Sequence, residues 1–169
     1  RTAQRRILRD IADLAPGDAA GGGYFGAIRF SPADPSGDRN VNLAASVGTL
    51  VLLKVNGDIR ESLSVASFDA RKGPRGKAST FFTTNQDLRG VIRFKNDGNV
   101  QVEPFGAITL KRFGTIVTNF QINAEDDVRA SALPDSIRRF DVKLDKVSSF
   151  GKFTMEGNFG YGSSGQLLS

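Results

Sequence analysis

The sequence predicts an all-β protein made of antiparallel β-sandwiches. Apolar and charged residues alternate along several segments, which places the apolar ones on one face of a pleated strand. The 169 residues include 19 glycines, and glycine suits the tight turns that a chain of many short strands needs. The apolar share of 39% is enough to cover a core, and 13 phenylalanines without tryptophan indicate that phenylalanine builds it.

The N-terminal part predicts a helix or an outer strand, followed by a hairpin. Residues 1–14 carry an apolar stripe beside four arginines, which fits a short amphipathic helix or an outer strand. Three consecutive glycines at 21–23 then lead into a strand over residues 24–30. Residues 47–55, VGTLVLLKV, form the most continuous apolar run, so we expect a strand that is buried on both faces.

Two loops in the first half are candidates for ligand contact. Residues 31–42 hold four Asp and Asn side chains, namely Asp34, Asp38, Asn40 and Asn42. The segment lacks the glycine position and the terminal glutamate of the best-known calcium loop, so a solvated loop is favoured. After an extended segment at 59–68, residues 70–79 form a basic, glycine-rich loop. Its four cations are candidates for contact with an anionic polymer: Arg71, Lys72, Arg75 and Lys77.

Residues 91–144 predict four half-buried strands. Their inward-facing residues are Ile92 and Phe94, then Ile108 and Leu110, and finally Phe140, Val142 and Leu144. Asn96-Asp97-Gly98-Asn99 predicts a hairpin between the first two of these strands, because Asp-Gly accepts the positive φ angles that a tight turn needs. Phe105-Gly106 and Phe113-Gly114 mark the next two corners, and Pro104 removes a hydrogen-bond donor where a strand should end.

The C-terminal part predicts one more strand and then a turn. Over residues 150–159, Phe153 and Met155 alternate with polar neighbours. A glycine-rich turn follows at 160–165, and we expect no strand after it, so that a neighbouring molecule would complete the sheet edge. We therefore divide the chain into a partial N-terminal β domain (1–57), a connecting strand with the basic loop (58–79), and a nearly complete C-terminal β-sandwich that lacks its last strand (80–169).

Among the features of the composition, the absence of histidine and cysteine excludes the most types of catalytic and metal site. It excludes disulfides, thiolate nucleophiles, Ser-His-Asp triads and ordinary zinc, copper or haem ligation. A hydrolase that works with carboxylates alone stays open as a remote alternative, and its candidates are Glu103 and the acidic run from Glu125 to Asp127. We expect no catalytic residues, no cofactor and no metal site.

Charge and hydropathy limit the partners. The net charge is +5, but residues 1–57 carry 7 basic against 5 acidic side chains, and residues 58–169 carry 16 against 13. A nucleic-acid interface concentrates its basic residues beside stacking aromatic rings, whereas here the rings fall on the apolar side of strands, so we expect no nucleic acid. No apolar run reaches about 18 residues, so we expect no membrane span.

Two parts of the sequence resemble a known family. Residues 14–30 (LAPGDAAGGGYFGAIRF) and 94–108 (FKNDGNVQVEPFGAI), with Leu133-Pro134 and Arg138-Arg139-Phe140, resemble the tandem immunoglobulin-like domains of WxL-interacting-type surface proteins, including relatives in ultrasmall candidate-phylum bacteria. The resemblance implies an exported protein, membrane-tethered in its longer precursor, whose first domain associates with peptidoglycan and whose second binds a host or partner. It identifies no ligand residues.

These observations favour a non-catalytic, extracellular bacterial cell-surface module for adhesion or for binding cell-wall polymer or other surface proteins. The alternative is self-association, as a structural subunit of a filament or surface layer completed by a strand from a neighbour.

Overall fold

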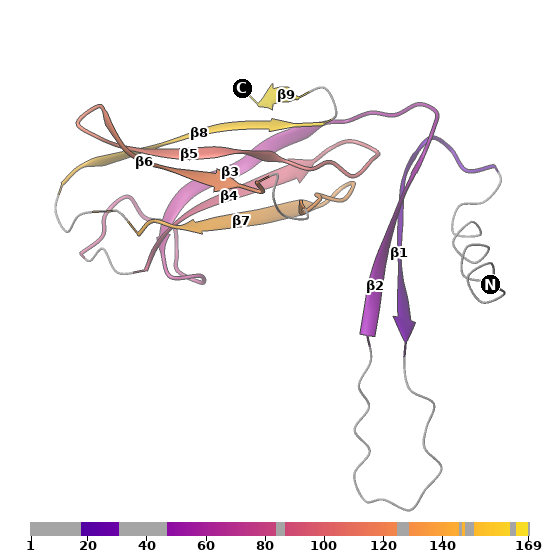
Figure 1. Ribbon diagram of the computed structural model, residues 1–169, viewed down its shortest axis with the longest axis horizontal. Helices are drawn as coiled ribbons and strands as arrows, with labels where there is room; N and C mark the ends of the chain where they lie inside the picture. Colours follow the sequence, from indigo (N-terminus) through magenta and orange to yellow (C-terminus); the bar gives the residue numbers. More distant parts are fainter. Residues whose placement is uncertain are drawn as a thin grey trace, which may run out of the picture. The chain divides into compact units, whose positions relative to one another are not determined.

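The computed structural model describes residues 18–30, 47–83, 87–124, 129–145, 147, 151–162 and 165–168 (Figure 1). The chain forms two compact units, Arg1–Ile59 and Arg60–Ser169, which we call the hairpin unit and the sandwich unit. All paired strands in the described residues run antiparallel, and none of these residues is helical. The all-β prediction is therefore confirmed.

The described residues of the hairpin unit form one two-stranded sheet. Strand β1 (Gly22–Phe30) pairs with β2 (Val47–Val55) from Gly22 opposite Val55 to Phe30 opposite Val47. At one end of the sheet the chain segments touch, because a Cβ atom on Gly21 would lie 2.6 Å from the Gly57 Cα. Only glycine fits so close an approach of two backbones.

The prediction that residues 47–55 are buried on both faces is wrong. Val47 is 69% exposed and Leu50 is 60% exposed. In the described part of the chain β2 pairs only with β1, and the sheet has two strands. Apolar composition makes β2 a strand, but burial requires a second layer, which the described residues of this unit do not supply.

The sandwich unit has two sheets that face each other (Figure 1). The first has the order β3-β4-β7 and consists of β3 (Leu63–Lys72), β4 (Leu88–Asn96) and β7 (Ile137–Lys143). The second has the order β6-β5-β8-β9 and consists of β5 (Phe105–Arg112), β6 (Thr115–Ile122), β8 (Phe153–Tyr161) and β9 (Gln166–Leu168). The segment expected to connect two domains thus supplies the edge strand β3.

Phenylalanine joins the two sheets across the core. The Phe159 ring of β8 packs edge-on against Phe94 of β4 at 5.3 Å and against Phe68 of β3 at 5.9 Å. Such aromatic pairs add about 0.5–1.5 kcal/mol beyond their buried area. Ile92, Phe94 and Ile108 are 0% exposed, as the alternation in β4 and β5 predicted.

Residues 96–99 do not form a hairpin, because β4 and β5 belong to different sheets. The physical reason lies in Asn96, which is 0% exposed. Its amide donates to the carbonyl oxygens of Val100 at 2.8 Å and Ala132 at 2.9 Å, and its Oδ1 accepts from the Gly98 N–H at 2.9 Å. These bonds stabilise a loop that carries the chain from one sheet to the other.

The local hairpin is instead β5–β6, closed by Phe113 and Gly114. Their φ angles are 49° and 82°, both positive as a tight two-residue turn requires. The chain also has a strand after Gly165, where none was expected. The reversal at Gly162 and Gly165, with φ of 75° and 65°, lets the short β9 return along β8.

Candidate binding cleft

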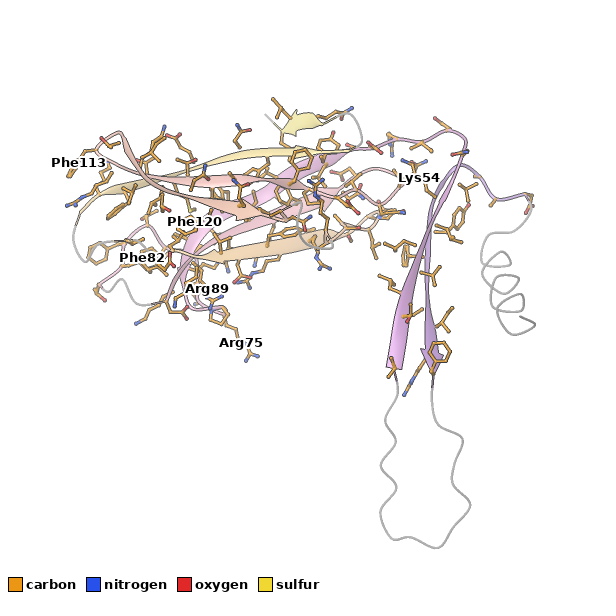
Figure 2. All side chains as sticks on the ribbon, viewed as in Figure 1. Lys54, Arg75, Phe82, Arg89, Phe113 and Phe120 are labelled. Carbon is orange, nitrogen blue, oxygen red and sulfur yellow. The ribbon has the colours of Figure 1, made fainter. Side chains whose placement is uncertain are left out.

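One end of the sandwich unit holds a cavity of about 1090 Å³ between the two sheets. Its walls come from β3, the segment before β4, the β5–β6 turn, the segment after β7 and the start of β8. Five of the lining residues are phenylalanines, namely Phe68, Phe81, Phe82, Phe113 and Phe153. Figure 2 shows Phe82 and Phe113 at this same end of the sandwich. We call this cavity the end cleft.

The end cleft has a buried floor and exposed walls. Leu88, Leu110 and Leu144 are at most 6% exposed and also belong to the core. Phe81 and Phe113, in contrast, are 77% and 80% exposed. The cleft is therefore an opening of the apolar core toward solvent.

Local geometry explains why these two rings are exposed. The tight β5–β6 turn places Phe113 at a chain reversal, where it has no neighbouring strand position to pack into. The segment that carries Phe81 is fastened to β3, since the Ser79 N–H donates to the Ala70 carbonyl at 3.0 Å. The Ser79 hydroxyl then donates to the Phe81 carbonyl at 2.8 Å and accepts from its N–H at 3.1 Å.

Asp69 is the one carboxyl group among the lining residues that the structure describes. The Arg71 guanidinium binds it through Nε and through Nη2, the latter at 2.9 Å. The hydrogen bond from Arg71 lowers the pKa of Asp69 below its ordinary value, and this effect outweighs the desolvation that raises it. Asp69 is thus a fixed anion with a bound cation, which makes it unsuitable as a proton donor at neutral pH.

One cation belongs to the lining of the end cleft, and a second, Arg112, adjoins three of its lining residues. The Arg112 guanidinium lies 5.4 Å from the Phe113 ring centre and 5.8 Å from that of Phe153. It also adjoins Gly151, whose added Cβ would lie 3.0 Å from the Arg112 Nε. Lys152 lines the cavity directly. Within the described residues, the side chains of Arg112 and Lys152 have no hydrogen-bond or ion-pair partner.

The predicted basic loop splits into one structural cation and three exposed ones. Besides binding Asp69, Arg71 donates to the Gly76 carbonyl at 3.3 Å and so closes its own loop. Lys72, Arg75 and Lys77 are exposed, and Figure 2 shows Arg75 pointing away from the sandwich. The loop ends at Ala78, where the segment that lines the end cleft begins.

The other sequence candidates lie elsewhere. Glu103 is exposed, accepts a hydrogen bond from Ser131 at 3.4 Å, and does not line the end cleft. The acidic run from Glu125 to Asp127, the loop over 31–42 and the segment 1–14 fall outside the described residues. The described residues contain no group of three or more acidic side chains that could hold a metal ion, and no helix long and apolar enough to cross a membrane.

Sequence reasoning missed the end cleft because its walls come from segments far apart in the chain. Two local features pointed to it. Phe81-Phe82 is an aromatic pair inside a polar loop, and Phe113 is a bulky apolar residue at a turn position where polar residues dominate. Comparison of the chain with protein-family models, curated proteins and solved structures found no match.

Proposed function

We propose that the chain is a non-catalytic, extracellular module of the cell surface, with immunoglobulin-like sandwich architecture, that acts in adhesion or in binding cell-wall polymer or another surface component. The end cleft is its binding site. The observation that carries this proposal is a preformed, solvent-open cavity with phenylalanine walls and few polar groups, which is the usual form of a ligand site.

Exposure and charge both support binding as the role of the end cleft. Large aromatic rings as exposed as Phe81 and Phe113, which line the same cavity, are typical of an interaction surface. The described lining offers no pair of carboxyl groups for acid–base chemistry, since its one carboxyl group is bound by Arg71.

Binding to isolated cell-envelope material tests the proposal. The double variant Phe81→Ser and Phe113→Ser removes exposed rings without opening the core, so it should fold normally and lose most of its binding in a co-sedimentation assay. The matched control is Phe25→Ser with Phe30→Ser, because both rings are 56% exposed and lie in the hairpin unit. Unchanged binding of the end-cleft variant would contradict the proposal.

A second candidate function, a structural subunit joined through strands, is favoured by strand β6. Its sequence TIVTNFQI has no charged residue and no proline, and Ile116 is 63% exposed. Among the described strands β6 pairs only with β5, so it is a sheet edge. An uncharged edge strand of eight residues is a template for pairing with another chain.

The other three described edges of the sandwich unit carry protective features. Strand β3 has a register irregularity between Val65 and Ser67, and β9 has only three residues. Strand β7, IRRFDVK, is charged at four of its seven positions. Strand β6 has only a register shift at its turn end, opposite Leu110 and Lys111. Bulges, short strands and charges all hinder edge-to-edge pairing, which leaves β6 as the least protected edge of the sandwich unit.

Light scattering over a concentration series, with negative-stain electron microscopy, tests this second candidate. The wild type should form polymers, and Asn119→Lys with Gln121→Lys should prevent them by placing charge on the β6 edge. Ile137→Lys on β7 is the control, because it adds charge to an edge that is already charged. A wild-type monomer at high concentration would exclude the structural role.

A further inference from the structure

We infer that the end cleft binds a single-chain amphiphile with an anionic head group, whose apolar chain lies among the phenylalanines and whose head meets Arg112 and Lys152. The inference deepens the proposed function, since it assigns a ligand class to the same site. Three features carry it: the depth of the apolar cavity, the position of the two cations, and the absence of a described carboxyl group that neutralises them.

The lining of the cavity offers mainly apolar side chains, as an apolar ligand chain requires. Its floor reaches the core residues Leu88, Leu110 and Leu144, which lie between the two sheets. The rings that wall the entrance extend the apolar surface outward. Its volume of about 1090 Å³ is slightly above the range of about 300–1,000 Å³ that small-molecule sites occupy. Burial of an alkyl chain there removes apolar surface from water, which favours binding.

The rim is positively charged. Arg112 is held over the Phe113 and Phe153 rings, an arrangement that orients a guanidinium without neutralising it. Its Nε is shielded from solvent and has no hydrogen-bond partner in the described structure. Asp69, the nearest candidate counter-charge in the described lining, is already bound to Arg71. The one described anion of the lining is thus paired with Arg71, and Arg112 and Lys152 have no anionic partner among the described residues.

The masked stretches that adjoin lining residues in the sequence add no carboxyl group. Residues 84–86 are Thr, Asn and Gln, and residues 146–150 add Lys146 but no carboxyl group. A cationic occupant is disfavoured by the charge of Arg112 and Lys152. An amphiphile with a carboxylate or phosphate head group places its apolar chain against the apolar floor and its negative charge next to Arg112 and Lys152.

Displacement of a fluorescent fatty acid from the full chain tests the inference, and the absence of tryptophan keeps the protein's own signal low. The competitors are palmitate, monopalmitoyl phosphatidylglycerol and the uncharged hexadecanol. We expect both anionic lipids to compete better than hexadecanol. A preference for palmitate would identify a carboxylate head, and a preference for the phospholipid would identify a phosphate head.

Two variants test where the head group and the apolar chain of the ligand bind, and a third serves as the control. Arg112→Gln with Lys152→Gln should weaken palmitate binding about tenfold or more, since charge-assisted contacts are lost, and leave hexadecanol binding unchanged. Arg138→Gln with Lys143→Gln removes the same charge from residues outside the cavity lining and should change palmitate binding by less than about twofold. Ala78→Trp adds bulk to an exposed lining position and should weaken all three ligands.

Each result supports or overturns a defined claim. Equal binding of palmitate and hexadecanol, or no loss in the Arg112 and Lys152 variant, would overturn the anionic head. Full binding by both Ala78→Trp and the Phe81 and Phe113 variant would overturn the end cleft as the lipid site. If no lipid binds while envelope binding still depends on Phe81 and Phe113, the ligand class is wrong and the proposed function stands.

Discussion

Strands β2 and β4 show how little apolar content says about burial. Strand β2, VGTLVLLKV, has six apolar side chains in nine residues, whereas β4, LRGVIRFKN, has four. Yet Leu50 of β2 is 60% exposed, and Ile92 and Phe94 of β4 are 0% exposed. The difference is that β4 is the central strand of a sheet with a second sheet against it, and β2 belongs to a two-stranded sheet.

The comparison shows where the stability of the chain resides. An isolated two-stranded hairpin is marginally stable in water, because it has no facing layer to exclude solvent from its apolar side chains. The sandwich unit buries both inner faces and adds the Phe94 and Phe159 contact between them. Truncating an apolar side chain should therefore change the free energy of unfolding by very different amounts in the two units.

The largest difference should come from apolar truncation. Phe94→Ala should lower the free energy of unfolding by about 3–5 kcal/mol, because it leaves a cavity between two packed sheets. Leu50→Ala removes an exposed side chain and should change it by less than about 0.5 kcal/mol. Urea unfolding followed by circular dichroism measures both.

If Phe94→Ala fails to fold, Ile92→Val keeps the comparison measurable, with an expected loss of about 0.5–1.5 kcal/mol. Equal effects of the β2 and β4 substitutions would mean that β2 is buried in solution and would contradict the difference described above.

A somewhat smaller difference should separate two asparagines. Asn96→Ala removes three hydrogen bonds of a fully buried side chain and leaves the Val100 and Ala132 carbonyls without this donor. The expected loss is about 3 kcal/mol, since each unsatisfied buried group costs about 1–3 kcal/mol. Asn56 is exposed in the turn after β2, so Asn56→Ala should be nearly neutral in the same assay. A neutral Asn96→Ala would show that its bonds do not stabilise the crossing between sheets.

The smallest effect should be the pH dependence of the Asp69–Arg71 pair in the sandwich unit. The hydrogen bond from Arg71 lowers the folded-state pKa of Asp69 below the unfolded value of about 3.9. The ionised group therefore stabilises the fold above that pH, and the stabilisation is lost as pH falls through the folded-state pKa. Thermal unfolding between about pH 2 and 6 should show a weaker acid dependence in both Asp69→Asn and Arg71→Gln. An unchanged dependence in Asp69→Asn would refute this role.

The sequence predicted the inward faces of several strands because alternation is a local property. Ile92, Phe94, Ile108 and Leu110 are all buried as expected. It failed at Asn96, where Asp97-Gly98 is a strong local turn pattern but the chain leaves its sheet. The partners that hold this bend include Ala132, 36 positions away, so no local pattern contains it.

The end cleft shows the same limit for the candidate site. The sequence identified the loop with Arg71, Lys72, Arg75 and Lys77, because these charged residues lie close together in the sequence. It did not identify Arg112 and Lys152, which are 40 positions apart in the sequence. They come near the same cavity only because β5 pairs with β8 and because Arg112 adjoins Gly151 and Phe153.

The sequence by itself determined that this chain forms antiparallel strands, which of their side chains face inward along β4, β5 and β8, and that chemistry based on histidine or cysteine is absent. These properties depend on composition and on a period of two residues. Only the tertiary structure decided which strands gain a second layer, that Asp97-Gly98 lies on a crossing between sheets, and that phenylalanines from distant segments surround one cavity. Those outcomes depend on contacts between residues far apart in the chain, whose energies no local segment contains.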